Sequence, residues 1–533
     1  MSVAETDVHQ AVRVKTGVSG LDDVTPGGWP SNHLYLIEGD PGAGKTTLAL
    51  QFLLEGSRSG ERVLYVTLSE SRHELQAVAR SHNWPLDAIE IFEFVPSPET
   101  LKAENEYSAL HPSEVEFQDT MQSILEKIDE VRPSRVVIDS LSEIRMLARE
   151  SIRYRRQVLA LKHFFLTRSC TVLMLDDRTS DHRDLQLHSI AHGVLLMERL
   201  PRDYGIERRH LRLTKLRGSV FREGFHDYTI ETGGLKVFPR LVAKEHRPPS
   251  RTGVASSGIP AFDALWGGGV PWGSSTLITG PAGSGKSSLS ISYAFAAAKR
   301  GESSALFHFD ETLGPLLERS RSLGMDLSPY FDSGVMEVRQ VDPAEVSPGE
   351  LVADIRDAVE ERGVRIVIID SLNGLLAAMA EEQQMALQMH ELCSYLNQKG
   401  VATFLVLAQA GILGPNTAPP VDLSYLADNV LLLRYFESEG AVKKALSVVK
   451  KRSGRHEGTI RELRMQDGSM EIGEPLREFS GVLSGVPIFS GSSVALERAM
   501  PQDHVKADRR RAAKRGRTAA KKTGGRSNGR AKR

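Results

Sequence analysis

Two stretches of the chain have the residue types and spacing of a phosphate-binding loop. Residues 39–46 read Gly-Asp-Pro-Gly-Ala-Gly-Lys-Thr, and residues 280–287 read Gly-Pro-Ala-Gly-Ser-Gly-Lys-Ser. Both fit G-x-x-x-x-G-K-[ST], and both interrupt an apolar run typical of a strand followed by a helix. A single match could be an ordinary glycine-rich turn. Two matches in equivalent surroundings, with Lys45 and Lys286 separated by 241 positions, predict two nucleotide sites.

The pattern suits phosphate because glycines let consecutive backbone N–H groups point at phosphate oxygens, while the following helix adds its positive N-terminal end. We expect the lysines to neutralise the β- and γ-phosphates, and the Thr46 and Ser287 hydroxyls to hold Mg²⁺. The residues expected to contact phosphate are Gly39, Gly42, Ala43, Gly44, Lys45, Thr46 and Thr47 in the first loop and Gly280, Gly283, Ser284, Gly285, Lys286, Ser287 and Ser288 in the second.

Matching strands follow each loop. Apolar runs at 62–68, 135–139 and 171–175 in the first half correspond to runs at 304–309, 365–370 and 402–407 in the second. Their alternation with helical patterns predicts an α/β fold in which two tandem domains each contain a mostly parallel twisted sheet flanked by helices. We place the domains at 14–246 and 247–495, with residues 245–250 as the linker.

Acidic residues end several of these strands. We expect Asp139 and Asp370 to face the nucleotide and orient Mg²⁺, although either could instead cap a turn. Hydrolysis also needs a carboxylate that orients the attacking water. Glu70 and the pair Asp310-Glu311, which follow the second strand of each half, are the candidate catalytic residues, and the alternative is a solvated acid at a helix start.

The composition is that of a soluble globular protein. Of the 533 residues, 25% are charged and 40% are hydrophobic, and no apolar run approaches the roughly 20 residues that span a membrane. The polar N-terminus differs from a secretory signal, so we expect a cytoplasmic protein without membrane contacts. Cys170 and Cys393 occupy non-equivalent places and are expected to be buried thiols.

The C-terminal tail differs from the rest of the chain. Residues 506–533 contain 13 Lys and Arg residues and a single acidic residue, Asp508. Because this stretch has no apolar periodicity, we predict that the tail, residues 496–533, is basic and disordered. Such a tail could make weak contacts with nucleic acid or another polyanion.

Several motifs together resemble the KaiC family, the circadian clock proteins and their relatives. They are the Gly20-Leu21-Asp22 lead-in, the duplicated loops, the acid after the second strand and Lys215-Leu216-Arg217-Gly218. The resemblance covers about residues 14–495. It implies two RecA-like P-loop NTPase domains that bind ATP between neighbouring subunits of a hexameric ring. The residues that would reach the neighbour's nucleotide are Lys215, Leu216, Arg217, Lys450 and Arg452.

The resemblance also implies autophosphorylation in the second domain, with Asp310 and Glu311 as the general base. The family's Ser-Thr phosphoacceptor pair corresponds here to Ser424 and Tyr425, so a phenol replaces the threonine hydroxyl. In the first domain Ser69 stands where the leading acid would be, which leaves Glu70 alone to orient water.

Three functions are therefore compatible with the sequence. The leading hypothesis is a KaiC-like regulatory ATPase with serine/threonine autokinase activity, which hydrolyses ATP at ring interfaces and acts on protein partners. The alternative is a nucleic-acid-dependent ATPase like RecA or DnaB, acting in DNA repair or translocation through the basic tail. A non-catalytic nucleotide-binding scaffold is the third, and the two intact loops and retained acids argue against it.

Overall fold

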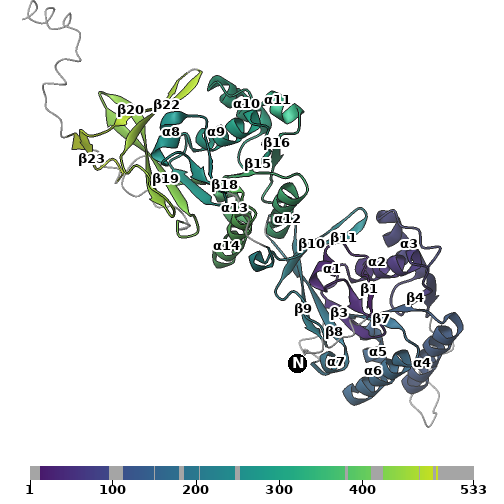
Figure 1. Cartoon of the computed structure of the whole chain (residues 1–533). Coiled ribbons are helices and arrows are strands. Elements are labelled where there is room, and N and C mark those ends of the chain that lie inside the picture. Colours follow the sequence, from purple (N-terminus) through teal and green to yellow (C-terminus); the bar gives the residue numbers. More distant parts are fainter. Residues whose placement is uncertain are drawn as a thin grey trace, which may run out of the picture.

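The computed structural model describes residues 12–94, 112–148, 150–178, 185–202, 204–246, 252–378, 382–409, 424–466, 468–483 and 488–489. The described chain forms two α/β domains that follow one another along the molecule (Figure 1). Each is built on a nine-stranded sheet, and the strand orders β11-β10-β9-β8-β3-β7-β6-β4-β5 and β16-β15-β17-β18-β14-β19-β20-β21-β22 are the same order read from opposite edges.

In the first sheet, six parallel strands are followed by three antiparallel ones. The strands are β3 (Leu34–Gly39), β4 (Val63–Thr67), β5 (Glu90–Glu93), β6 (Arg135–Asp139), β7 (Thr171–Asp177), β8 (Gly193–Leu200), β9 (Arg208–Leu216), β10 (His226–Glu231) and β11 (Gly234–Phe238). The helices are α2 (Lys45–Arg58), α3 (Arg72–Ser81), α4 (Pro112–Val131), α5 (Leu141–Ala148), α6 (Ser151–Leu166) and α7 (Leu185–Ile190).

The second sheet repeats this plan. Its strands are β14 (Ser275–Gly280), β15 (Ser304–His308), β16 (Met336–Gln340), β17 (Ile366–Asp370), β18 (Ala402–Ala408), β19 (Asn429–Ser438), β20 (Ala441–Lys451), β21 (Arg461–Gln466) and β22 (Ser469–Pro475). Its helices are α9 (Lys286–Lys299), α10 (Leu313–Ser322), α11 (Ser328–Asp332), α12 (Pro348–Glu360), α13 (Leu372–Ala378) and α14 (Glu382–Gln398).

Short elements complete the described chain. They are β1 (Arg13–Val14), α1 (Leu21–Val24), β2 (Trp29–Pro30), the 3₁₀ turn η2 (Ala243–Glu245), β12 (Val254–Ala255), α8 (Pro260–Leu265), β13 (Val270–Pro271), β23 (Phe479–Ser480) and β24 (Ile488–Phe489). Among the residues described, no helix combines the length and apolar character needed to cross a membrane.

Apolar side chains cover both faces of each sheet. Strands β6 and β17 are buried along their whole length, as expected for central parallel strands with helices on both sides. Two buried apolar clusters per domain, one on each face, form the core. The predicted α/β fold with two tandem domains is confirmed, and each predicted strand agrees with an observed one to within two residues at either end.

The two cysteines are buried, as predicted. Cys170 immediately precedes β7, and Cys393 lies within α14. Of the predicted linker, Glu245 belongs to η2, whereas residues 247–250 lie outside the described residues, as does the basic tail at 496–533.

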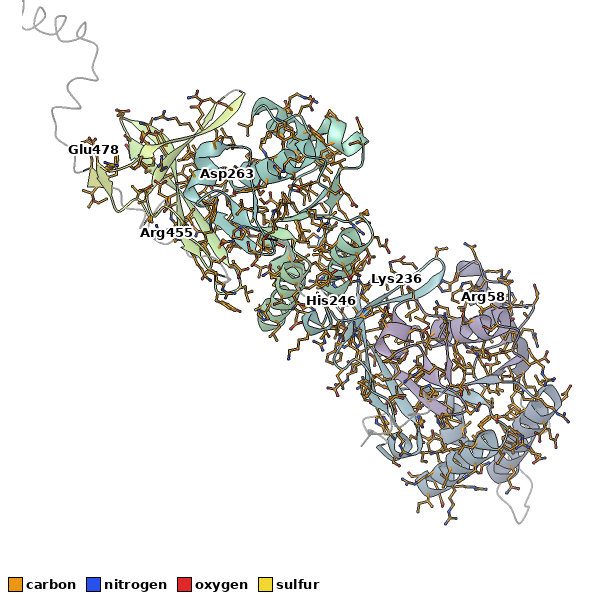
Figure 2. All side chains as sticks on the ribbon, viewed as in Figure 1. Arg58, Lys236, His246, Asp263, Arg455 and Glu478 are labelled. Carbon is orange, nitrogen blue, oxygen red and sulfur yellow. The ribbon has the colours of Figure 1, made fainter. Side chains whose placement is uncertain are left out.

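The domains contact each other directly. The carboxylate of Asp227 in β10 accepts a hydrogen bond of 2.7 Å from the backbone N–H of Gly349, in the first turn of α12. A carboxylate at a helix N-terminus satisfies a backbone donor that the helix itself cannot. Figure 2 shows His246 at this junction, where its ring packs against Tyr395 of α14 with 4.6 Å between centroids. The described residues on either side of the junction therefore pack against each other.

Candidate nucleotide sites and the far edge of each sheet

Each phosphate loop lies between the central strand of its sheet and the helix that follows. In the first domain β3 leads into α2, and in the second β14 leads into α9. Gly44 and Gly285 precede these helices with φ angles of 93° and 104°, in the left-handed region that favours glycine. A Cβ on Gly44 would also lie 2.5 Å from Ile230 Cδ1. The positive φ therefore requires glycine in this turn, and at Gly44 a side chain would also displace the end of Ile230.

The first loop is surrounded by carboxylates. Lys45 is buried, and its Nζ donates to the carbonyls of Gly39 and Asp40 at 2.9 and 3.0 Å and pairs with Asp177 Oδ1 at 2.6 Å. The Thr46 hydroxyl lies 3.4 Å from Asp139 Oδ2. These contacts bring together the lysine, hydroxyl and carboxylate predicted from the sequence, and they add Asp177, which the sequence analysis did not select.

Asp139 lies deeper in this site. The phenol of Tyr65 in β4 donates to Asp139 Oδ2 at 2.5 Å. Burial raises the pKa of Asp139, while the hydrogen bond from Tyr65 and the charge of Lys45 act in the opposite direction. A divalent cation beside this carboxylate would favour its ionised form.

Glu70 follows β4 and lies near the carboxylate of Asp139. The hydroxyl of Thr67 donates to the carbonyl of Glu70 at 2.6 Å and accepts from its backbone N–H at 3.0 Å, which fixes the turn. Glu70 Oε2 is buried without a hydrogen-bond partner among the described residues. Burial, followed by the charge of Asp139, raises the pKa of Glu70 to about 7. A carboxyl with this pKa is suited to accept a proton near neutral pH.

The second loop has fewer charges around its lysine. Lys286 is buried, and its Nζ donates to the carbonyl of Pro281 at 2.8 Å. Burial lowers the pKa of Lys286 to about 8, against the opposing charge of Asp370. The residue that corresponds to Asp177 is Ala408, because each is paired with the last residue of its central strand. Within the described residues, Lys286 therefore has no counterpart of the Asp177 ion pair.

The acids of the second domain have partners. Asp310 accepts a hydrogen bond of 2.6 Å from the Ser371 hydroxyl, next to Asp370. Glu311 is bound by Arg319 of α10 at 2.9 and 3.0 Å. His308, the last residue of β15, is buried with its Nδ1 3.9 Å from Asp370 Oδ2. Arg319 and His308 were missed because nothing in their local sequence pattern marks them.

Magnesium is compatible with these residues. Mg²⁺ is usually held by one or two carboxylates together with substrate phosphates and water, without a complete protein cage. The Thr46–Asp139 contact supplies a hydroxyl and a carboxylate beside the first loop. Within the described ranges no three His, Cys, Asp or Glu residues are grouped closely enough to hold a metal by themselves. Thr46 and Asp139 would therefore hold the ion together with phosphate and water, and Ser287 and Asp370 are the equivalent residues of the second domain.

The Lys-x-Arg motifs lie away from the loops of their own domains. Lys215 pairs with Val194, which lies opposite Leu36 near the beginning of β3. The loop begins at Gly39, three residues farther along that strand, so Lys215 and the start of the loop are about 10 Å apart along the strand direction. Lys450 is placed in the same way, because it pairs with Val430, which lies opposite Leu277 of β14. Both motifs therefore lie beside the beginning of the central strand, whereas the phosphate loop follows the end of that strand. We call this end of each sheet its far edge.

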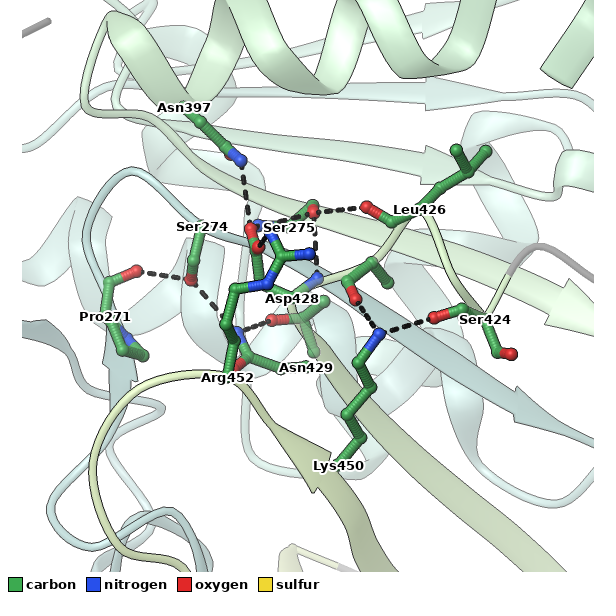
Figure 3. Close-up of polar contacts among 12 residues, drawn as sticks. Pro271, Ser274, Ser275, Asn397, Ser424, Leu426, Asp428, Asn429, Lys450 and Arg452 are labelled. Atoms are coloured by element: carbon green, nitrogen blue, oxygen red, sulfur yellow. Dashed lines mark hydrogen bonds and ion pairs between the residues drawn. The ribbon is translucent and has the colours of Figure 1, made fainter. Parts of the chain in front are cut away.

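In the second domain this far edge contains the candidate phosphoacceptor turn (Figure 3). Lys450 Nζ donates to the carbonyls of Ser424 and Ala427 at 2.9 and 2.8 Å. Arg452 donates to Asp428 Oδ1 at 2.8 Å. Tyr425 is 59% exposed. Ser424 and Tyr425 are therefore distant from the phosphate loop of their own domain and close to its Lys-x-Arg motif.

The first domain has a matching arrangement. Lys215 donates to the carbonyls of His188 and Ala191, the latter at 2.8 Å, and Arg217 donates to the carbonyl of Ser189 at 2.5 Å. Leu216, between them, is only 6% exposed and packs into the domain core. Among the residues predicted to contact a neighbouring subunit, Leu216 therefore has a side chain that is buried in its own domain.

Comparisons with known proteins agree with this geometry. The KaiC ATPase family model matches residues 14–242 and 255–477. The circadian clock oscillator protein KaiC of Acaryochloris marina is 26% identical over 492 residues, covering 90% of this chain and 92% of the relative. The circadian clock protein KaiC3 of Synechocystis is 24% identical over 497 residues, covering 90% and 95%. Two KaiC domains account for most of the sequence, and the chain belongs to the KaiC family of ATPases.

Proposed function

We propose that this chain hydrolyses ATP with Mg²⁺ in both domains, at sites shared between neighbouring subunits of a homo-hexameric ring, and that its second domain phosphorylates Ser424. The observation that carries the proposal is the position of the Lys-x-Arg motifs. Lys215 and Lys450 lie about 10 Å or more from the phosphate loops of their own domains, which supports a role toward the nucleotide of an adjacent subunit instead of their own.

The contacts support the roles that we assign to the site residues. The glycines and Lys45 or Lys286 hold the phosphates, and Asp139 and Asp370 orient the metal. Glu70 orients water in the first domain, where its buried, unpaired oxygen supports this role. Asp310 and Glu311 act as the base in the second domain. Ser424 is the preferred acceptor because a phenol at Tyr425 lies farther from the backbone than a threonine hydroxyl, so the same in-line geometry would require the loop to move.

Such a protein acts by changing its conformation, which alters the binding of partner proteins. A γ-phosphate and its Mg²⁺ order loops that relax after hydrolysis, and a phosphoserine at the far edge adds charge beside Lys450 and Arg452. We propose regulatory protein partners, a cytoplasmic location and domain boundaries at 14–246 and 247–495. The relatives described above are named as clock proteins, which supports regulation over the DNA-dependent alternative.

A mixing experiment tests the shared site. A Lys286→Ala chain has no functional second loop but keeps Ser424, whereas a Ser424→Ala chain has the loop but lacks the acceptor. Neither chain alone should incorporate label from γ-labelled ATP at Ser424. The mixture should label Ser424 of the Lys286→Ala chain, identified by peptide mass spectrometry, because the neighbour supplies the nucleotide. Labelling of Ser424 in the Lys286→Ala chain alone, or none in the mixture, would contradict the proposal.

A deletion tests the nucleic-acid alternative. The chain is truncated before Lys506, and ATP hydrolysis is measured with and without single-stranded DNA at two salt concentrations. We expect the truncation to remove any DNA binding and leave hydrolysis unchanged, since the lost binding would depend on the tail's charges. Hydrolysis that is stimulated by DNA and survives the truncation would favour the motor function.

A further inference from the structure

Both phosphate loops are contacted by a side chain from the neighbouring strand. Arg199 Nη1 in β8 donates to the carbonyl of Pro41 at 2.7 Å, and the Tyr435 hydroxyl in β19 donates to the carbonyl of Ala282 at 3.0 Å. Arg199 and Tyr435 occupy equivalent positions. Arg199 lies two residues after Met197, whose carbonyl faces Gly39, and Tyr435 lies two residues after Leu433, whose carbonyl faces Gly280. An added Cβ on Gly42 or on Gly283 would lie 2.9 Å from Arg199 Nη1 or the Tyr435 hydroxyl, respectively. Each side chain therefore lies directly on its loop.

Arg199 makes a second connection that a tyrosine cannot. Its Nε donates to Glu207 at 2.9 Å, and its Nη2 donates to the two carboxylate oxygens of Glu207 at 2.6 Å each. Glu207 immediately precedes β9, at the end of the turn that joins β8 to β9. The guanidinium thus bridges the first phosphate loop and this turn through charge-assisted hydrogen bonds, which are stronger than neutral ones.

The turn between β8 and β9 also contacts the second domain. The backbone N–H of Ile206 donates to the carbonyl of Ala344 at 3.1 Å, and Arg208 Nη2 donates to the carbonyl of Pro343 at 2.9 Å. Gly205 lies so close that a Cβ there would be 2.6 Å from Ala344 O. The residues on either side of Glu207 are therefore fixed to residues 343–344.

Residues 343–344 lead back to the second nucleotide site. The backbone N–H of Val341 donates to the carbonyl of His308 at 2.7 Å. His308 ends β15, two residues before Asp310, one of the candidate catalytic acids. Covalent and hydrogen bonds thus run without a gap from the acids of the second site to the phosphate loop of the first.

We propose that Arg199 is a positioning residue for the first phosphate loop, and that through Glu207 it couples the affinity of that loop for ATP to occupancy of the second site. A nucleotide that orders the end of β15 would also order residues 341–344 and the β8–β9 turn. The first loop would then lose less conformational entropy when it binds ATP, so affinity rises without a large structural change. This inference rests on the proposed function only in requiring that both loops bind ATP.

Three calorimetric titrations of the full chain with ATP and Mg²⁺ measure the coupling. The Lys286→Ala protein gives the affinity of the first loop alone, and the Lys45→Ala protein gives that of the second loop alone. The unsubstituted chain gives the product of both affinities multiplied by the coupling factor. We expect a factor of about five, within the usual range for coupled sites. Light scattering confirms that the compared proteins have the same oligomeric state.

Two substitutions distinguish the role of the Arg199–Glu207 bridge from that of the Arg199–Pro41 contact. Arg199→Tyr places on Pro41 the hydroxyl that the second domain uses, but removes the bond to Glu207. Glu207→Gln leaves the Pro41 contact and weakens the bridge by removing its charge. Both should reduce the coupling factor to about one, and a merely structural role of Arg199 would not change this factor. Tyr435→Phe is the control, because it weakens binding at its own loop and leaves the factor unchanged.

The outcomes are distinguishable. A factor of one in the unsubstituted chain, or a factor that survives either Arg199→Tyr or Glu207→Gln, would overturn the inference while leaving the proposed function intact. No ATP binding at either loop would instead contradict the proposed function. Glu207→Gln also serves if Arg199→Tyr fails to fold.

Discussion

Arg319 binds both carboxylate oxygens of Glu311, at 2.9 and 3.0 Å, and the described part of the first domain has no counterpart of this pair. Helices α3 and α10 occupy equivalent places, and the position of Arg319 is taken in α3 by Val78, which packs against the core. Glu311 therefore forms an ion pair with a cation. Burial and the charges of Asp139, Glu74 and Asp177 raise the pKa of Glu70, and the charge of Lys45 opposes them. The two candidate water-orienting residues differ in electrostatics although they are equivalent in position.

This difference predicts that removing the cation at position 319 and adding one at position 78 change the hydrolysis rates of the two sites in opposite directions. Arg319→Gln should raise hydrolysis at the second site about threefold, because a carboxylate without a cation is a stronger proton acceptor. Val78→Arg should lower hydrolysis at the first site by a similar factor. Each rate is measured in a background where the other loop carries the Lys→Ala change. Melting temperatures control for damage to the core at Val78, and two effects of the same sign would contradict the electrostatic explanation.

The Lys45–Asp177 pair predicts how tightly the first loop binds. Asp177 competes with phosphate for Lys45 and adds a negative charge to the site. Asp177→Ala should therefore tighten ATP binding at the first loop about tenfold, which is a reasonable effect for one partly screened charge. Ala408→Asp is the matched change in the second domain and should weaken binding there. Calorimetry of the single-loop proteins measures both, and weaker binding after Asp177→Ala would show that Asp177 assists the nucleotide.

Glu70 predicts a pH dependence of stability without nucleotide. Its folded pKa of about 7 lies above the value near 4.3 of an unfolded chain, so between these pH values the folded state holds a proton that the unfolded state has lost. The contribution of Glu70 to the unfolding free energy should therefore fall as pH rises from about 4.5 to 7 and then level off. Glu70→Gln should lack this fall. Denaturant unfolding at several pH values measures the difference, and parallel curves would contradict the raised pKa.

Lys286 predicts proton uptake on binding. Burial lowers the pKa of Lys286 to about 8, so at pH 8.5 much of the free protein carries a neutral amine. Phosphate favours the ammonium form, so ATP binding to the Lys45→Ala protein should take up a proton at pH 8.5 and almost none at pH 6.5. Calorimetry in buffers of different ionisation enthalpy counts the protons. Lys286→Arg is the control, because arginine stays charged and should show no uptake at either pH.

The sequence identified the features that depend on local patterns. A phosphate loop needs a fixed spacing of glycines, lysine and hydroxyl, and a buried parallel strand needs a run of β-branched residues, so both could be found without knowing what packs against them. Asp139 and Asp370 were found for the same reason, as acids at strand ends. Asp177 also ends a strand and could have been selected by that criterion, had the predicted strand been extended from Leu175 to its observed end.

Contacts between distant segments were decided only by the tertiary structure. Arg199 reaches Pro41 because β8 lies beside β3. Lys215 lies far from its own loop because β9 is antiparallel to β8, so the end of β9 that holds Lys215 lies at the opposite end of the strands from the loop. Neither fact has a local signature, since it depends on strand order and register. The sequence alone therefore determined that the chain contains two loops of the phosphate-binding pattern and where they lie. The packing of sheets and domains decided which charges surround each site, because electrostatic and hydrogen-bond partners act through space and not along the chain.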